Sequence, residues 1–336
     1  IIDYVRKYLA IFLGILFPLL TLIFSLRYWY RHGRDPKGTG IIVPQYDTSD
    51  DLSPIEVSGI VNEKISTEDI SAEIIFLATK GYLKIHQFEK TGFLVSTFDY
   101  EFIKLKDEND LPKEYHKMLM KGLFQSGDKV TLSSLDQKFY RIPQEVVAFA
   151  TSGLAAGGYY KNLSYLKRGP IDRTRLLFLA PISLILGLIL SFFDDAPFLI
   201  LPFFGIDINL VPAMLGVLLS IVIFGMVTHF NPAKTEKGVA TKEYYLGLKD
   251  YLQIAEKDRI QFHNAPEKKP EVFEKLLPYA MVLGVTSIWA KEFEGIYSVP
   301  PIWYEGSQGT AFNSMVFVSS LDDFNSSASS SLNSAP

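Results

Sequence analysis

Side chains that commonly carry out chemistry are few in this sequence and lie far apart. The chain has no cysteine, which excludes disulfides, thiolate zinc sites and thiol nucleophiles. No two of its histidines lie at a metal-ligand spacing, and none belongs to an H-E-x-x-H pattern. The histidines are His32, His86, His116, His229 and His263. We therefore predict no metal site and interpret each histidine as a surface or junction residue.

Glycine and acidic patterns also give weak signals for catalysis. The sequence contains no P-loop and no G-x-S-x-G motif. Gly153, Gly157 and Gly158 have no strand–loop–helix context, which indicates a helix end and a turn instead of a phosphate-binding loop. Asp50 and Asp51 precede a helix start and are interpreted as part of it. We predict no catalytic or cofactor-binding residue, no cofactor, and no enzymatic activity.

Composition indicates a membrane protein made of more than one part. The 336 residues allow about two domains. The hydrophobic fraction is 48% and the mean hydropathy is +0.15, and the apolar residues are concentrated in a few long uncharged runs. This excludes a disordered chain and a single soluble domain, and the net charge of −4 gives no general reason to expect a nucleic-acid partner. Because the chain starts at Ile1, we expect it to be a piece of a longer protein.

Three uncharged runs are long enough to be interpreted as membrane spans. They are Tyr8–Leu26, Leu176–Phe193 and Ile208–Phe230, with 19, 18 and 23 residues. A spanning helix needs about 20 apolar residues. The predicted fold class is therefore a membrane protein with three transmembrane α-helices, at about 8–29 within residues 1–30, at 176–193 and at 208–230. No charged residue lies within these runs, so an ion or proton relay through them is unsupported.

The distribution of Lys and Arg predicts an orientation. Positive residues mark cytoplasmic flanks, and they number four in 27–37, five in 161–175 and three in 234–242. The short outer loop 194–207 has none. We therefore expect a multi-pass protein of the cell membrane, in contact with the lipid bilayer, with its N-terminus outside and its main soluble parts in the cytoplasm.

Helix caps and an alternating pattern organise residues 47–165, which follow a juxtamembrane linker at 31–46. A capping box at Ser53–Glu56 starts one helix, Ser66 starts a second, and Gly81 ends it. Alternating hydrophobic residues after this glycine predict a β-hairpin. Helix, helix and hairpin is the order of a winged helix, so we predict a cytoplasmic α+β winged-helix-like domain.

The charge of this predicted domain argues against a nucleic-acid partner. Its candidate recognition helix has Glu68, Asp69 and Glu73 against Lys80 alone. Residues 47–111 contain more Asp and Glu than Lys, and no Arg. Such a surface repels phosphate instead of releasing counterions to it. We interpret most of these acidic residues as a solvated face and expect no nucleic acid to bind.

The C-terminal part, 231–300, is predicted to be a cytoplasmic helical module. Residues 236–262 show the spacing of an amphipathic helix. The uncharged run Leu276–Ala290 is short for a span, so we expect a helix that packs on 236–262 or on the 47–165 domain. Residues 306–336 are small, polar and serine-rich, and they predict a disordered tail.

Five blocks of sequence carry a resemblance to a known family. They are YRHGRDPKG (30–38), IIVPQYDTSDDLSPIEV (41–57), DISAEIIFLATKGYLKI (69–85), GLKDYLQIAEKDRI (247–260) and LPYAMVLGVTSIWAKEF (277–293). In this order, after a predicted membrane helix, they resemble the domain of unknown function 2207 family of predicted prokaryotic membrane proteins. The resemblance implies a secretion signal and an extracytoplasmic domain upstream, and it transfers no catalytic residue.

These observations lead to a functional hypothesis without a defined biochemical activity. We expect a non-catalytic multi-pass membrane protein, acting as a scaffold or signal-coupling protein that links an external domain to protein partners at the cytoplasmic face. Two alternatives remain open. The first is a membrane-tethered transcription regulator, and the second is an accessory subunit of a transporter or envelope enzyme.

Overall fold

The computed structural model divides the chain into two compact units. The first unit comprises Ile1–Asp35 and Lys161–Lys234, and the second comprises Pro36–Tyr160 and Thr235–Pro336. The structure describes residues 2–48, 52–91, 96–135, 141–161, 215–216, 218–223, 225, 233–253, 269–294, 299–306 and 313–333.

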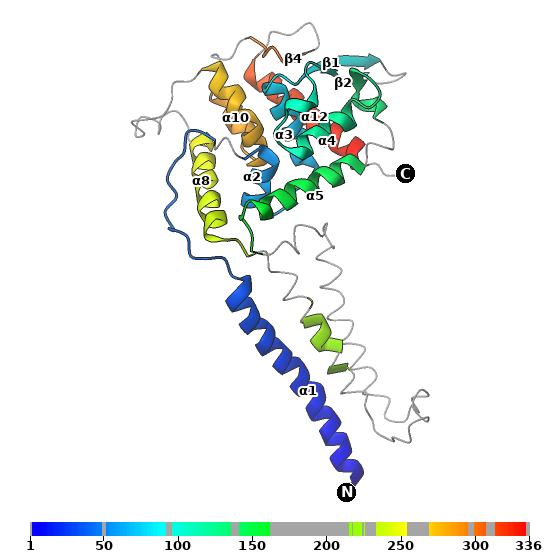
Figure 1. Cartoon of the computed structure of the whole chain (residues 1–336), viewed down its shortest axis with the longest axis vertical. Coiled ribbons are helices and arrows are strands. Elements are labelled where there is room, and N and C mark those ends of the chain that lie inside the picture. Colours follow the sequence, from blue (N-terminus) through cyan, green and yellow to red (C-terminus); the bar gives the residue numbers. More distant parts are fainter. Residues whose placement is uncertain are drawn as a thin grey trace. The chain divides into compact units, whose positions relative to one another are not determined.

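Helix α1 (Ile2–Tyr28) is the longest described element of the first unit, and it continues into a π-helical turn, η1 (Trp29–Gly33) (Figure 1). Several of its apolar side chains are exposed, with Phe24 at 71% and Ile15 at 66%. A Cβ on Gly216 would lie 2.5 Å from the carbonyl oxygen of Gly14. Glycine at this contact therefore allows two helical backbones to approach closely.

The prediction of three transmembrane helices is wrong for the part of the chain that the structure describes. No helix there combines the length and the apolar character that a membrane crossing needs. The prediction counted uncharged residues, whereas a span requires one continuous helix of about 20 apolar residues. An uncharged run does not by itself establish such a helix. Residues 176–193, the loop 194–207 and most of 208–230 lie outside the described residues.

The second unit begins with two capped helices, α2 (Pro54–Val61) and α3 (Thr67–Thr79). Both start with a capping box, in which Ser53 pairs with Glu56 and Ser66 with Asp69. Each box satisfies N–H groups that have no partner within the helix. Helix α3 ends before Gly81, whose φ of +76° confirms the predicted left-handed position.

A four-stranded sheet follows, in the order β3-β2-β1-β4. The hairpin of β1 (Leu83–Thr91) and β2 (Ser96–Lys104) is antiparallel, and β3 (Lys129–Thr131) extends it beside β2. The last strand, β4 (Tyr304–Glu305), pairs with β1 in parallel from the far end of the sequence. The sheet is therefore completed only by the C-terminal part of the chain.

Further helices complete the second unit. They are α4 (Glu114–Leu123), α5 (Arg141–Ala156), α8 (Glu236–Gln253), α10 (Pro270–Val282), α11 (Thr286–Lys291) and α12 (Ser314–Asn333). Short 3-10 turns, η2 (Glu108–Asp110) and η3 (Leu132–Ser134), connect the strands and α4. Helices α2, α10 and α12 pack on α3, and every residue from Asp69 to Ile75 is buried (Figure 1). Helix α3 is therefore the centre of the second unit.

The winged-helix interpretation is not supported, although the order of helix, helix and hairpin is present. A recognition helix needs an exposed face that can enter a groove of DNA. Helix α3 has no such face, because helices from the C-terminal part cover it. The hairpin is also the middle of a mixed sheet instead of a free wing. The fold class is thus corrected to a mixed α/β unit with many helices.

The run Leu276–Ala290 forms parts of α10 and α11, and it packs within the second unit as expected. Leu276, Leu277 and Leu283 are buried, and α10 contacts α2 and α3. Asn62 at the end of α2 donates to the carbonyl of Val282 at 2.9 Å. Ile288, near the end of the same run, is 44% exposed.

The serine-rich end differs from the predicted disordered tail. Helix α12 covers most of it and packs on α3, with Phe317, Leu321 and Phe324 buried. The ring of Phe324 lies 5.2 Å from that of Tyr100 and 5.9 Å from that of Phe102. The average composition is small and polar, but three large apolar residues on one helical face are sufficient to hold the helix on the core.

Replacing Phe324 by Ala tests whether α12 belongs to the folded core. The loss of a fully buried ring should lower the free energy of unfolding of the full chain by about 3–5 kcal/mol in urea denaturation. Val316→Ala is the matched control, because Val316 lies on the same helix and is 46% exposed. The control should change stability by less than about 0.5 kcal/mol. Equal effects of the two changes would contradict the packing of α12.

Candidate functional site

Glu73 and His116 form a buried carboxylate–imidazole pair in the second unit. Their side chains are 0% and 4% exposed, and Nε2 of His116 contacts Oε1 of Glu73. The second oxygen of Glu73 accepts the backbone N–H of Ile55 at 2.9 Å. Ile55 lies in the first turn of α2, where N–H groups lack partners within the helix. The pair therefore joins α2, α3 and α4.

A second carboxylate lies at the same end of α2. Glu56 accepts the backbone N–H of Ser53 at 3.0 Å and forms an ion pair with Lys113. The hydroxyl groups of Ser53 and Tyr115 are 2.8 Å apart and share a hydrogen bond. We call the six residues the buried acid–base cluster: Ser53, Glu56, Glu73, Lys113, Tyr115 and His116.

Burial determines the protonation of the phenol in this cluster. Desolvation, and then the negative charges of Glu73 and Glu56, raises the pKa of Tyr115, so its hydroxyl stays protonated. The partial positive charge at the N-terminus of α2 favours both carboxylates. Because Glu73 and His116 are almost inaccessible to solvent, the two side chains join three helices in the interior of the second unit.

A cavity of about 260 Å³ lies next to this cluster, between the last turn of α3 and α10. Its lining consists of Thr48, Phe76, Thr79, Lys80, Glu271, Glu274, Lys275 and Tyr279. We call it the α3–α10 cavity. The rings of Phe76 and Tyr279 meet edge to face at 6.1 Å, and Phe76 also lies 5.8 Å from the ring of His116. The aromatic wall of the cavity thus rests on the buried cluster.

Two of the charged residues at the cavity have protein partners. Lys275 forms an ion pair with Asp47 at 2.6 Å, and Glu274 accepts the indole N–H of Trp303 at 2.8 Å. Burial alone would raise the pKa of Asp47, but the hydrogen bonds from Lys275 and from the backbone N–H of Thr48 lower it. Asp47 therefore stays ionised and keeps Lys275 in place.

The segment Pro36–Thr48, which we call the strap, runs along α8 (Figure 1). Glu243 of α8 accepts three hydrogen bonds from it: the N–H of Thr39 at 3.1 Å, the hydroxyl of Thr39 at 2.8 Å and the N–H of Gly40 at 3.0 Å. The Thr39 hydroxyl and the Gly40 N–H lower the pKa of Glu243. The carboxylate therefore fixes the beginning of the strap.

Glycines in the strap and in α8 make the close contact between them possible. A Cβ on Gly38 would lie 2.0 Å from Oε1 of Glu243, and a Cβ on Gly247 would lie 2.0 Å from the carbonyl oxygen of Val43. Gly40 has a φ of +69°, which L-residues with side chains rarely adopt. A larger residue at position 247 would push the strap away from α8 at Val43, and one at position 38 would displace the carboxylate of Glu243.

The far end of the strap reaches the α3–α10 cavity. The ring of Tyr46 packs edge to face on Tyr251 at 4.9 Å, and the hydroxyl of Tyr244 donates to the carbonyl of Asp47 at 2.9 Å. Asp47 then holds Lys275, and Thr48 forms part of the cavity lining. The strap is therefore a continuous covalent and hydrogen-bonded connection from residue 36 to the cavity.

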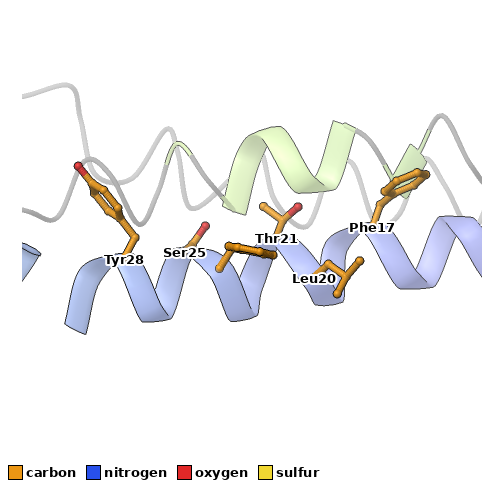
Figure 2. A pocket seen from close by; sticks show the side chains of 6 residues that line it. Phe17, Leu20, Thr21, Ser25 and Tyr28 are labelled. Atoms are coloured by element: carbon orange, nitrogen blue, oxygen red, sulfur yellow. The ribbon is translucent and has the colours of Figure 1, made fainter. Parts of the chain in front are cut away.

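A second hollow, of about 370 Å³, lies along α1 in the first unit. Figure 2 shows Phe17, Leu20, Thr21, Ser25 and Tyr28 on one face of the helix, and Phe24 also lines the hollow. The lining is apolar apart from three hydroxyl groups, so it contains no set of side chains suited to acid–base or metal chemistry.

The described histidines lie in different environments. His86 is a surface residue on β1, with Nδ1 3.7 Å from the carboxylate of Glu101. His32 lies in η1. The interpretation of His116 as a surface or junction residue is wrong, because it is buried beside Glu73. His229 and His263 lie outside the described residues.

Other predicted positions have simple roles. Gly153 lies in α5, and Gly157 and Gly158 form the turn after it, with a φ of +73° at Gly158. The prediction of a helix end and turn is thereby confirmed. Asp50 and Asp51 lie outside the described residues. Within the described ranges, no group of three or more His, Asp and Glu is arranged to hold a metal ion.

Sequence reasoning missed Glu73 because it interpreted the acidic residues of 68–73 as a solvated face. The helical spacing contained the missing signal. Glu73 lies three residues after Ile70 and four before Leu77, so it occupies the same buried stripe as these two residues. A charged residue on an apolar stripe requires a partner, which is His116.

Comparison with known families assigns the chain to one of them. The family described as "Predicted membrane protein (DUF2207) C-terminal domain" matches residues 43–293. The chain belongs to this family, as the sequence resemblance suggested, and it is associated with a membrane. The matched part includes the cluster, the cavity and α8. No curated protein and no solved structure matches the chain.

Replacing Glu73 by Leu tests whether the buried pair stabilises the second unit. The change removes one partner of a buried hydrogen bond and leaves both the Ile55 N–H and the His116 ring nitrogen without that partner, so it should lower the unfolding free energy by about 1–3 kcal/mol for each unsatisfied group. The double variant with His116→Leu should lose less than the two single changes added together, by about 0.5–3 kcal/mol. Urea denaturation measures all three variants. Glu145→Gln, at an exposed position of α5, is the control, and strictly additive effects of the two single changes would disprove the pairing.

Proposed function

We propose that this chain is a non-catalytic coupling protein of the membrane. Its second unit contacts protein partners at the cytoplasmic face, and the strap relays mechanical or chemical changes between the membrane-associated part and that unit. The observation that carries this proposal is the docked strap, which starts at residue 36, is fixed by Glu243 and ends at the cavity lining.

The bonding of the strap supports a relay instead of a flexible tether. A tether is a solvated segment with few contacts. The strap instead holds Glu243, packs Tyr46 on Tyr251 and pairs Asp47 with Lys275. A displacement of its first residues would therefore alter the position of Lys275 and Thr48 at the cavity.

Two further observations support the cytoplasmic side and a protein partner. Four basic residues lie between the end of α1 and the first residues of the strap: Arg27, Arg31, Arg34 and Lys37. A cluster of this kind is attracted by the negative lipids of the cytoplasmic leaflet, by about 1 kcal/mol per residue. Exposed apolar residues on the second unit, with Ile302 at 94%, are suited to contact with another protein. The alternative of a transcription regulator loses support, because α3 is buried.

Gly247→Ala tests the relay. Alanine favours the helical state of α8 by about 1 kcal/mol over glycine, but its Cβ would displace the strap at Val43. We expect hydrogen exchange in the intact chain to increase roughly tenfold in the strap and also in α10 near the cavity.

Gly153→Ala is the control for this experiment. It also places a Cβ on a helical glycine, but the nearest atom, Oε1 of Glu56, is 3.7 Å away. It should leave exchange in the strap and in α10 unchanged. An increase confined to the strap after Gly247→Ala would show that the segment is only a tether.

Cysteine labelling tests the cytoplasmic position of the second unit. The chain has no native cysteine, and Ser152 on α5 and Asp250 on α8 are exposed. Ser152→Cys and Asp250→Cys should be protected from a membrane-impermeant maleimide in intact cells and labelled after permeabilisation. Labelling of both positions in intact cells would place the unit on the opposite side.

A further inference from the structure

We propose that the α3–α10 cavity is a binding site for a small zwitterion that carries one ammonium and one carboxylate group, as a free amino acid does. The inference rests on the geometry and charges of the cavity and does not depend on the coupling role. Nothing in the family description assigns a ligand to the chain.

Two lysines and two glutamates line the cavity, and two of these four side chains have a polar partner in the protein. Lys275 is paired with Asp47, and Glu274 accepts a hydrogen bond from Trp303. Lys80 contacts the face of Phe76 at 5.4 Å. Within the described residues, neither Lys80 nor Glu271 has a salt-bridge partner, although both line the cavity. Lys80 therefore attracts a carboxylate, and Glu271 attracts an ammonium group.

The end of α3 also favours the ammonium group of the ligand at the cavity. The cavity lies at the C-terminal turn of α3, where the aligned peptide dipoles of the helix give a partial negative charge. This potential adds to that of Glu271 and Glu274 and favours an ammonium group. A multiply charged anion such as a nucleotide would be repelled by these groups, whereas Lys80 attracts the single carboxylate of a zwitterion.

The size and wall of the cavity select a small ligand with some apolar surface. Pockets for drug-sized molecules measure roughly 300–1,000 Å³, so a cavity of about 260 Å³ fits a smaller molecule. Phe76 and Tyr279 supply aromatic surface, and Thr48 and Thr79 supply hydroxyl groups. The hydroxyl of Tyr279 donates to the carbonyl of Leu52 at 2.8 Å, so its ring is held in place before a ligand arrives.

Titration calorimetry on the full chain in detergent tests this proposal with glycine, L-serine and L-leucine as probes. We expect at least one of them to bind. For L-leucine the matched probes are 4-methylpentanoate, which lacks the ammonium group, and 3-methylbutylamine, which lacks the carboxylate. Each should bind about tenfold more weakly than the zwitterion, because each loses one charge-assisted contact.

Two variants identify the residues that bind the ligand. Lys80→Met and Glu271→Gln should each reduce the affinity about tenfold, and Lys80→Met should remove the preference for leucine over 3-methylbutylamine. Lys121→Met on α4 and Glu145→Gln on α5 are controls that remove the same charges away from the cavity. A thermal unfolding midpoint for each variant shows that it is folded.

The outcomes separate clearly. A zwitterion that binds more tightly than both single-charge analogues, with loss in the two cavity variants alone, supports the site. The absence of heat with all three amino acids up to roughly 10 mM overturns the proposal, because that limit lies tenfold above a millimolar dissociation constant. Equal binding by the single-charge analogues also overturns it, as does equal binding by the cavity variants and their controls.

Discussion

The second unit depends on a carboxylate buried in the middle of its central helix. Glu73 has no exposed surface, and a buried carboxyl group is tolerated only when its oxygen atoms have hydrogen-bond partners. These partners are the N–H of Ile55 at the start of α2 and the imidazole of His116 on α4. The positions of both helices relative to α3 are therefore constrained by one side chain. Phe76, one turn further along α3, transfers this constraint to the wall of the cavity.

The second constraint is close backbone contact at glycines, which determines the position of the strap on α8. Hydrogen bonds from Thr39 and Gly40 reach Glu243 only because Gly38 leaves room for the carboxylate. The carbonyl of Val43 can lie on α8 only because position 247 has no side chain. The cost of glycine in a helix, about 1 kcal/mol relative to alanine, is offset by this contact. The strap is consequently part of the folded unit and connects residue 36 to the cavity.

The C-terminal part of the chain completes a core that the N-terminal part begins. Strand β4 adds an edge to the hairpin, and Phe324 of α12 packs on the inward rings of Tyr100 and Phe102. The hydroxyl of Tyr304 donates to the side-chain carbonyl of Gln87 at 2.9 Å within the same sheet. The cavity likewise takes one wall from α3 and the other from α10. A ligand there would contact both parts of the sequence at once.

The sequence by itself determined the features that depend on near neighbours. The capping boxes, the left-handed Gly81, the hairpin and the burial of Leu276 and Leu277 all follow from spacing and residue type within a few positions. The family was also evident from the order of its sequence blocks. Uncharged runs, in contrast, did not establish spanning helices among the described residues.

Only the tertiary structure decided what depends on distant partners. It placed Glu73 beside His116, Glu243 on the strap and the serine-rich end on α3. The spacing of Glu73 with Ile70 and Leu77 indicates burial, but local sequence cannot reveal the partner of the carboxylate, because that partner comes from a distant segment. The same holds for α12, whose polar composition indicates disorder until a surface for Phe317 and Phe324 is present. The free energy of burial is gained only when two segments pack on each other, so it cannot be deduced from either segment alone.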